Sequence, residues 1–161
     1  MQGILTAGLV SRAYEVVRPA IEAVLKSGVT DGKDVVIVVT ATKDINPYSV
    51  EKLSSFADAC YLVDAIGDPA NSKYPITRIA LSKAEISART GLPTAKVPPQ
   101  YLLDEDTLYY GSAVLDGIVV ACSGVEPYYD EMFSYWIAAA VQAEVKKVYD
   151  ALRVKNLDFV P

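Results

Sequence analysis

The chain has 161 residues, of which 52% are hydrophobic and 22% charged, and its formal net charge is −5. This length and apolar content predict one domain over residues 1–161 with a full core, and they exclude a disordered chain. The 15 lysines and arginines form no basic stripe, which argues against a nucleic-acid partner.

Targeting signals and cysteine usage point to one compartment. The first ten residues lack the basic region and cleavage site of a signal peptide, and no apolar run approaches the ~20 residues of a membrane span. Cys60 and Cys122 lie inside apolar runs, so we expect reduced thiols that pack as small hydrophobic side chains. We therefore expect a cytoplasmic protein without a membrane partner.

The first expected elements are a helix and a strand. Apolar residues at helical spacing predict a helix over residues 11–27, with Gly28 as its stop and Pro19 marking a kink or a second start. Residues 34–40 are β-branched and continuously apolar, which predicts a strand buried on both faces.

The middle of the chain alternates between turns and regular elements. Asn46 and Pro47 predict a turn, with a short helical piece after it, and residues 60–65 predict a second strand. A helix is expected from about Pro75 to Thr90, ending at Gly91.

The clearest local pattern is a hairpin. Apolar runs over residues 109–115 and 118–122 flank Asp116 and Gly117, and an Asp-Gly pair tolerates the positive φ angles of a type I′ turn. The sequence therefore predicts two antiparallel strands here.

The last expected helix covers residues 126–152, with acidic residues at its entry and basic ones at its far end, which suits the helix dipole. Residues 132–143 are apolar nearly all the way round, more than one sheet face can cover. Either this helix is central in the fold, or it packs against another subunit of a homo-oligomer.

Three segments in this order resemble the GlcG/HbpS family, which includes the C-terminal domain of PduO-type proteins. They are the helical segment 79–89, the hairpin at Asp116 and Gly117, and Ser123-Gly124 followed by Asp130-Glu131. The resemblance covers the chain from about Val35 onward.

The resemblance implies a mixed α/β (α+β) fold of the profilin-like type, with about five antiparallel strands flanked by helices in α/β/α layers. It also implies homo-oligomers. Some members bind haem, and others are linked to cobalamin or glycolate gene contexts.

The chain departs from the family pattern at three places. It contains no histidine, so the histidine-ligated haem of some members cannot be carried over. Residues 45–57 resemble an insertion between the first two strands, and Val119 to Cys122 replace the family's glycine before the Ser-Gly pair. The cofactor is therefore unknown, with haem or cobalamin suggested by the resemblance alone.

The lack of histidine also excludes Ser-His-Asp and Cys-His catalysis. Cys60 and Cys122 do not have the spacing of metal ligands, so we expect no metal site. No glycine-rich phosphate-binding loop of a standard pattern is present.

Lys83 is the most suggestive single residue. On a helical wheel the side chains of Arg78, Ser82, Glu85 and Arg89 share one face, expected to be solvated, and Lys83 lies opposite among apolar residues. Its ammonium could reach the rim of the core, or it could meet a carboxylate or an anionic ligand.

The remaining candidate site residues lie near the entry of the last helix. Asp130 and Glu131 could compensate the helix dipole, or one of them could face Lys83 across a pocket. Ser123 and Gly124 could form a structural turn or present backbone N–H groups to an anion. Tyr109, one of several tyrosines nearby, suits an interface or a ligand rim.

These residues leave three functions open. The first is a small-ligand-binding module for a tetrapyrrole or similar anionic molecule, using the residues named above. The second is an enzyme in which Lys83 and Asp130 carry out acid–base chemistry on a small anionic metabolite. The third is an assembly or interaction protein, suggested by the apolar last helix.

Overall fold

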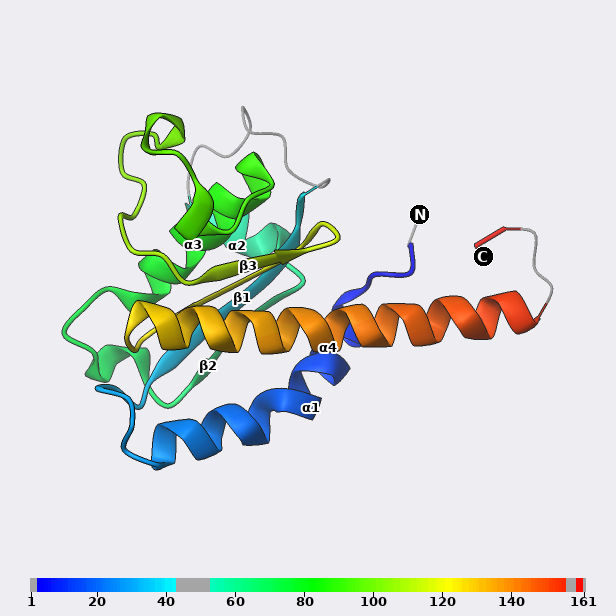
Figure 1. Ribbon diagram of the computed structural model, residues 1–161, viewed down its shortest axis with the longest axis horizontal. Helices are drawn as coiled ribbons and strands as arrows, with labels where there is room; N and C mark the ends of the chain where they lie inside the picture. The colour runs from blue at the N-terminus through cyan, green and yellow to red at the C-terminus, as the bar shows by residue number, and fades with distance from the viewer. Residues whose placement is uncertain (1–2, 43–52, 156–158, 161) are drawn as a thin grey trace.

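The computed structural model describes residues 3–42, 53–155 and 159–160 of the chain. This part of the chain has a mixed α+β fold, in which helices flank one antiparallel sheet (Figure 1). The helices and strands in chain order are α1 (Ala7–Lys26), β1 (Val35–Ala41), α2 (Leu53–Ala59), β2 (Leu62–Ile66), α3 (Ile76–Thr90), β3 (Ser112–Leu115), β4 (Ile118–Ser123) and α4 (Pro127–Val154).

The sheet has the strand order β2-β1-β4-β3, and all three pairings are antiparallel. Strand β1 is central, and all seven of its residues are buried, which confirms the prediction of a strand covered on both faces. Its second residue, Val36, pairs with Ser123 at the end of β4. The start of β1 and the end of β4 therefore lie at the same edge of the sheet.

Helices cover both faces of the sheet, in the α/β/α layering that the family resemblance implies. Val35, Ile37 and Val39 of β1 belong to a core cluster with residues of α1 and α4, which lie side by side on one face. Val36 and Val38 point to the opposite face and pack against α2 and α3. The alternation of side chains along a strand divides the core in this way.

Most elements lie close to where the sequence predicts them. Asp116 and Gly117 have φ angles of 49° and 81°, as the predicted type I′ turn requires. Helix α3 ends at Gly91, which adopts the left-handed conformation with φ of 72°. Helix α1 begins four residues earlier than predicted, because the Thr6 hydroxyl caps it by accepting a hydrogen bond from the Leu9 N–H.

Other expectations differ from the structure or are not covered by it. The sheet has four strands in the described part of the chain, where about five were expected. The predicted Asn46-Pro47 turn lies outside the described residues. The segment interpreted as an insertion, residues 45–57, is described only from residue 53, where it belongs to α2. Both cysteines are free, as predicted, although only Cys122 is fully buried.

The predicted solvated face of α3 is wrong for three of its four residues. Ser82 and Glu85 are buried, and the Arg89 side chain is only 12% exposed. The chain that follows α3 folds back over this face: the Thr107 N–H donates to Ser82 Oγ at 2.9 Å, and Asp106 pairs with Arg89 at 2.8 Å. The spacing of apolar residues along α3 does not predict contacts with residues that lie further along the chain.

The first half of α4 packs against both the sheet and α1, with Phe133, Ile137 and Val141 fully buried. A central position in one subunit therefore accounts for much of the apolar segment 132–143. The second half of the helix extends beyond the sheet and α1 (Figure 1). Within the described residues, no helix is both long and apolar enough to span a bilayer.

Candidate functional site

A cleft of about 710 Å³ opens at the edge of the sheet where β4 ends and β1 begins. Its walls come from the loop before β1, the segment after β2, the first turns of α3 and the entry of α4. Several polar or charged side chains line it together with apolar and aromatic ones, namely Asp31, Lys33, Asp34, Lys73, Lys83, Ser123, Glu126 and Asp130 with Tyr74, Ile76, Ile79 and Tyr109.

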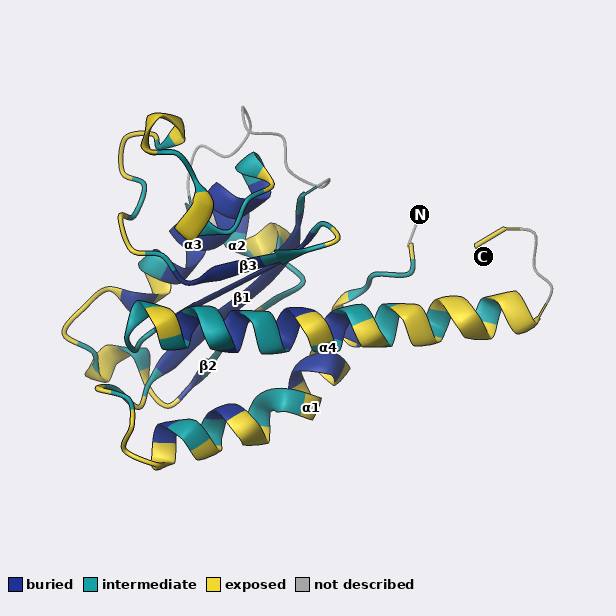
Figure 2. Cartoon of the chain, in the orientation of Figure 1, coloured by how far each residue is buried: buried dark blue, intermediate teal, exposed yellow. Residues whose placement is uncertain are grey.

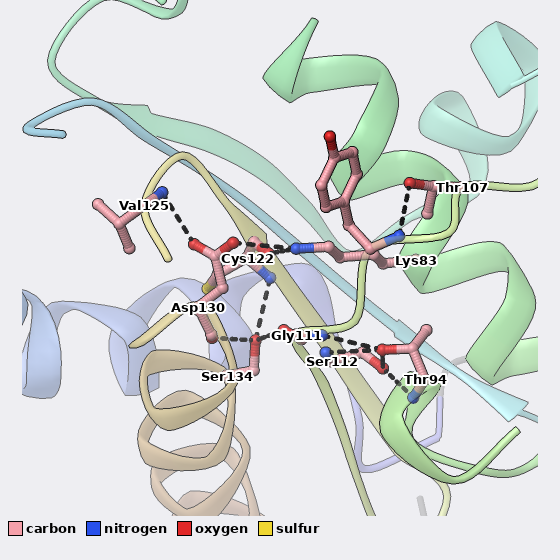
Figure 3. A network of polar contacts seen from close by, with 10 residues as sticks. Lys83, Thr94, Thr107, Gly111, Ser112, Cys122, Val125, Asp130 and Ser134 are labelled. Atoms are coloured by element: carbon pink, nitrogen blue, oxygen red, sulfur yellow. Dashed lines mark hydrogen bonds and ion pairs between the residues drawn. The ribbon is translucent and has the colours of Figure 1, made fainter. Parts of the chain in front are cut away.

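Lys83 lies at the floor of this cleft and is only 1% exposed. Its ammonium nitrogen donates to the carbonyl oxygen of Cys122 at 2.9 Å and to Asp130 Oδ2 at 3.0 Å (Figure 3). Of the two interpretations of this lysine, the structure therefore supports the one in which it meets a carboxylate.

Asp130 comes from the first turn of α4 and is as deeply buried as its partner. Its second carboxylate oxygen accepts a hydrogen bond from the Val125 N–H at 3.2 Å. Burial raises the pKa of the Asp130 carboxyl from 3.8 to about 6, although the nearby Lys83 ammonium lowers it. Asp130 can therefore exchange a proton near neutral pH.

Two further residues, Gly111 and Ser134, shape the space around this pair. A Cβ atom on Gly111, where φ is +140°, would lie 2.7 Å from Lys83 Nζ and 2.8 Å from Asp130 Cβ. Ser134 Oγ lies 2.7 Å from the Gly111 carbonyl oxygen and accepts a hydrogen bond from the Cys122 N–H at 3.0 Å. A glycine before a strand and a serine inside a helix are common, so the sequence offers no signal for either role.

The structure brings most of the predicted site residues together. Ser123, Gly124 and Tyr109 line the same cleft as Lys83 and Asp130. A side chain on Gly124 would collide with the backbone oxygen of Asp34, so a glycine is required for this close approach. Glu131 does not line the cleft, and of the acidic pair at the entry of α4 only Asp130 faces Lys83.

The cleft also contains charged residues that the sequence did not point to. Asp31 and Glu126 lie side by side, with the Asp31 N–H donating to the Glu126 carboxylate at 3.2 Å. Partial burial and the Glu126 carboxylate raise the pKa of Asp31. The lining thus presents four carboxylates and three ammonium groups, an environment suited to a polar ligand of low net charge.

The donor set limits the cofactors that could bind. Among the described residues, no three histidine, cysteine or acidic side chains are grouped closely enough to hold a metal ion. A haem iron in this cleft could take a phenolate ligand from Tyr74 or Tyr109, but both are half exposed, and within the described part of the chain neither phenolic oxygen has a hydrogen bond that would orient it. The residues present therefore do not form a recognisable haem site.

No protein-family model, curated protein or solved structure matches this chain.

Proposed function

We propose that this protein binds a small anionic molecule in the cleft above Lys83 and Asp130, as a member of the GlcG/HbpS family with a profilin-like fold. The observation that carries the proposal is the placement of a lysine ammonium, almost fully buried, at the floor of an open cleft. Burying an ion pair is costly compared with an apolar pair of the same size, so a purely structural role gives little reason to keep it there.

The size and lining of the cleft support a small-molecule ligand. A volume of about 710 Å³ lies within the usual range for small-molecule pockets. The ammonium group of lysine has three N–H donors, and the structure assigns acceptors to two of the three in Lys83. The remaining donor is available for an oxygen of the ligand.

A ligand screen tests this proposal. The protein is incubated with haemin, cobalamin, flavin mononucleotide and benzoate as probes, and bound species are measured by absorbance and native mass spectrometry. We expect at least one probe to bind at micromolar concentration and to lose at least tenfold in affinity in Lys83→Met, because the ammonium is replaced by a neutral group of similar length. Lys146→Met, at an exposed position of α4, is the matched control. Equal binding by both variants contradicts the proposal.

A second candidate function is proton-transfer catalysis on a small anionic metabolite, with Asp130 as the base and Lys83 stabilising the negative charge that develops. The observation in its favour is the raised pKa of Asp130, since a general base works best when its pKa is near the working pH. Deuterium incorporation from D₂O into pyruvate, followed by NMR, tests it. Asp130→Asn should abolish the protein-dependent rate, and Glu131→Gln should retain it.

We also propose that the protein assembles into a homo-oligomer through the second half of α4, in the cytoplasm. Val145, Val148 and Leu152 form a half-buried stripe there, and Tyr149 and Val154 are exposed beside it (Figure 2). Val145 and Val148 pack against the core of their own subunit, so the apolar surface left for a partner is the exposed Tyr149 and Val154. Light scattering should give more than one subunit for the natural chain and one for Tyr149→Glu with Val154→Glu, while Lys146→Glu serves as control. A monomeric natural chain at ~100 µM, well above common homodimer dissociation constants, contradicts this.

A further inference from the structure

The floor of the cleft holds a second polar group with unused hydrogen-bonding capacity. Ser123 is 3% exposed and lines the cleft, and its hydroxyl has no hydrogen-bond partner among the residues that the structure describes. Its side chain points to the α3 side of the sheet, because neighbouring Cys122 belongs to the core cluster on the opposite face. Ser123 and Lys83 therefore reach into the cleft from the same side of the sheet.

Among the described residues, the only fully buried side-chain polar atom without a partner is Tyr14 Oη, so the Ser123 oxygen reaches the open space of the cleft and is accessible to a ligand. Both Ser123 and the Lys83 ammonium can donate a hydrogen bond. Two donors at one end of a cleft suit a group with two acceptor oxygens.

The wall next to these donors is apolar. Ile76 and Ile79 come from the first turn of α3, and the rings of Tyr74 and Tyr109 lie at the rim. A ligand whose acceptor group is attached to an apolar body would fill this part of the cleft.

The charges in the cleft favour a ligand with few negative charges. Four carboxylates, including Asp130, line the cleft against three ammonium groups, so a doubly charged anion would be repelled more strongly than a singly charged one, and protonation of Asp130 would balance the two sets of charges. Among the described residues that line the cleft there is no arginine, the side chain that most often binds phosphate in a bidentate manner.

Building on the proposed function, we propose that the ligand is a monocarboxylate with an apolar body, bound by Lys83 and Ser123, and that Asp130 takes up one proton from solvent when it binds. The proton prevents two carboxylates from standing ionised side by side in a buried site. The protonated Asp130 then donates a hydrogen bond to the carboxylate of the ligand, and Lys83 keeps its charge.

The direction of the proton uptake follows from like-charge repulsion. With a pKa of about 6, Asp130 is mostly ionised at pH 7 in the free protein, and a second carboxylate beside it raises that pKa further. The titratable groups that face Asp130 or share the cleft with it are Lys83 on α3, Cys122 on β4, Asp31, Lys33 and Asp34 before β1, Lys73 and Tyr74 after β2, Tyr109 before β3, and Glu126 before α4. Of these groups, Asp130 is the one that forms an ion pair with the buried Lys83 ammonium.

Calorimetric titration with benzoate as the probe tests the proposal, with benzamide as its neutral counterpart. Titrations in Mops and Tris buffers, which differ in ionisation enthalpy, give the number of protons taken up. We expect about one proton per benzoate near pH 7 and fewer at pH 5, where Asp130 already holds its proton. The affinity should fall roughly tenfold per pH unit above pH 6, until the pKa in the complex is passed. Benzamide should bind at least tenfold more weakly.

Two variants and a control separate this mechanism from a purely structural role of the pair. Asp130→Asn should bind benzoate at least as tightly as the natural chain at pH 7.5 and without proton uptake, because its side chain is already neutral. Ser123→Ala should lose roughly tenfold in affinity, as expected for one hydrogen bond to a charged group. Ser11→Ala, at an exposed position of α1, should change nothing.

The possible failures are distinguishable. Benzoate binding without proton uptake, or equal affinity for benzamide, overturns this inference and leaves the proposed function intact. Binding of haemin or cobalamin together with no binding of benzoate has the same meaning. No binding of any probe overturns both. If Asp130→Asn does not fold, the two-buffer comparison on the natural chain decides the question by itself.

Discussion

Lys83 Nζ lies 3.0 Å from Asp130 Oδ2, although 47 residues of sequence separate the two side chains. Both side chains are almost fully buried. Lys83 also donates to the Cys122 carbonyl oxygen near the end of β4, and Asp130 accepts from the Val125 N–H just after that strand. The pair therefore joins α3, β4 and α4 at one edge of the sheet.

Breaking this pair should be far more costly than replacing it. Asp130→Ala leaves a buried ammonium without its counter-charge, and we expect it to lower the free energy of unfolding by about 3–5 kcal/mol. The double variant Lys83→Met with Asp130→Leu removes both charges and should recover most of that loss. Urea denaturation measures both. A loss of less than about 1 kcal/mol in the single variant, the range of an exposed pair, would mean that the lysine is solvated.

The pH dependence of stability should carry the sign of a carboxyl whose pKa is raised by folding. Between pH 3.8 and about 6, the folded protein holds a proton on Asp130 that the unfolded chain has released. The contribution of Asp130 is therefore fully present below pH 3.8 and is lost as the pH rises through about 6. Denaturation of the natural chain and of Asp130→Asn across this window should show the natural chain losing stability relative to the variant. The opposite slope would mean that pairing with Lys83 outweighs burial.

Gly111 should tolerate no side chain, because of its position against the ion pair. In Gly111→Ala the new Cβ would press on Lys83 Nζ and Asp130 Cβ, and we expect a loss of about 1–3 kcal/mol from crowding beyond the backbone strain. Gly28→Ala is the control, since Gly28 also has a positive φ but a Cβ there would meet nothing within 4 Å. Thermal or urea denaturation of the two variants measures the difference, and equal losses would show that crowding is absent.

Arg89 should hold the segment between α3 and β3 on the protein. Its guanidinium pairs with Glu85 and Asp106 and donates to the Tyr101 carbonyl oxygen at 2.9 Å. Arg89→Met should cost about 3 kcal/mol, as for a buried pair that loses one partner, and should speed amide hydrogen exchange over residues 98–110.

The control for Arg89 is Arg78 on the same helix. Its side chain is 60% exposed and pairs with Glu105 at 3.8 Å, so Arg78→Met should cost less than about 0.5 kcal/mol and leave the exchange pattern unchanged. Similar effects of the two substitutions would contradict a specific role for Arg89.

The two thiols should be inert in the folded protein. Burial raises the pKa of Cys122 to about 12 and that of Cys60 to about 11, so neither forms the reactive thiolate near neutral pH. Iodoacetamide at pH 7.5 should alkylate both cysteines in urea and neither in the native state within an hour. Mass spectrometry of the digested protein measures which cysteines are alkylated. Rapid labelling of Cys122 in the native state would contradict its burial.

Local sequence determined the elements of this fold. The β-branched run of β1, the Asp116-Gly117 turn and the Gly91 stop each act through their own backbone preferences, which neighbouring residues are sufficient to reveal. The inward position of Lys83 was also visible, because helical periodicity places it on the same side as Ile76 and Ile79.

Tertiary structure alone decided what those residues meet. Periodicity gave α3 a solvated face, but the chain after it returns and buries Ser82 and Glu85, an outcome set by contacts distant in sequence. Asp130 lies on the buried stripe of α4 with Phe133 and Ile137, but its meeting with Lys83 depends on the packing of α4 beside the end of β4. The crowding at Gly111 and the position of Ser123 beside Lys83 in the cleft arise only where several elements converge, and the sequence of one element does not reveal such contacts.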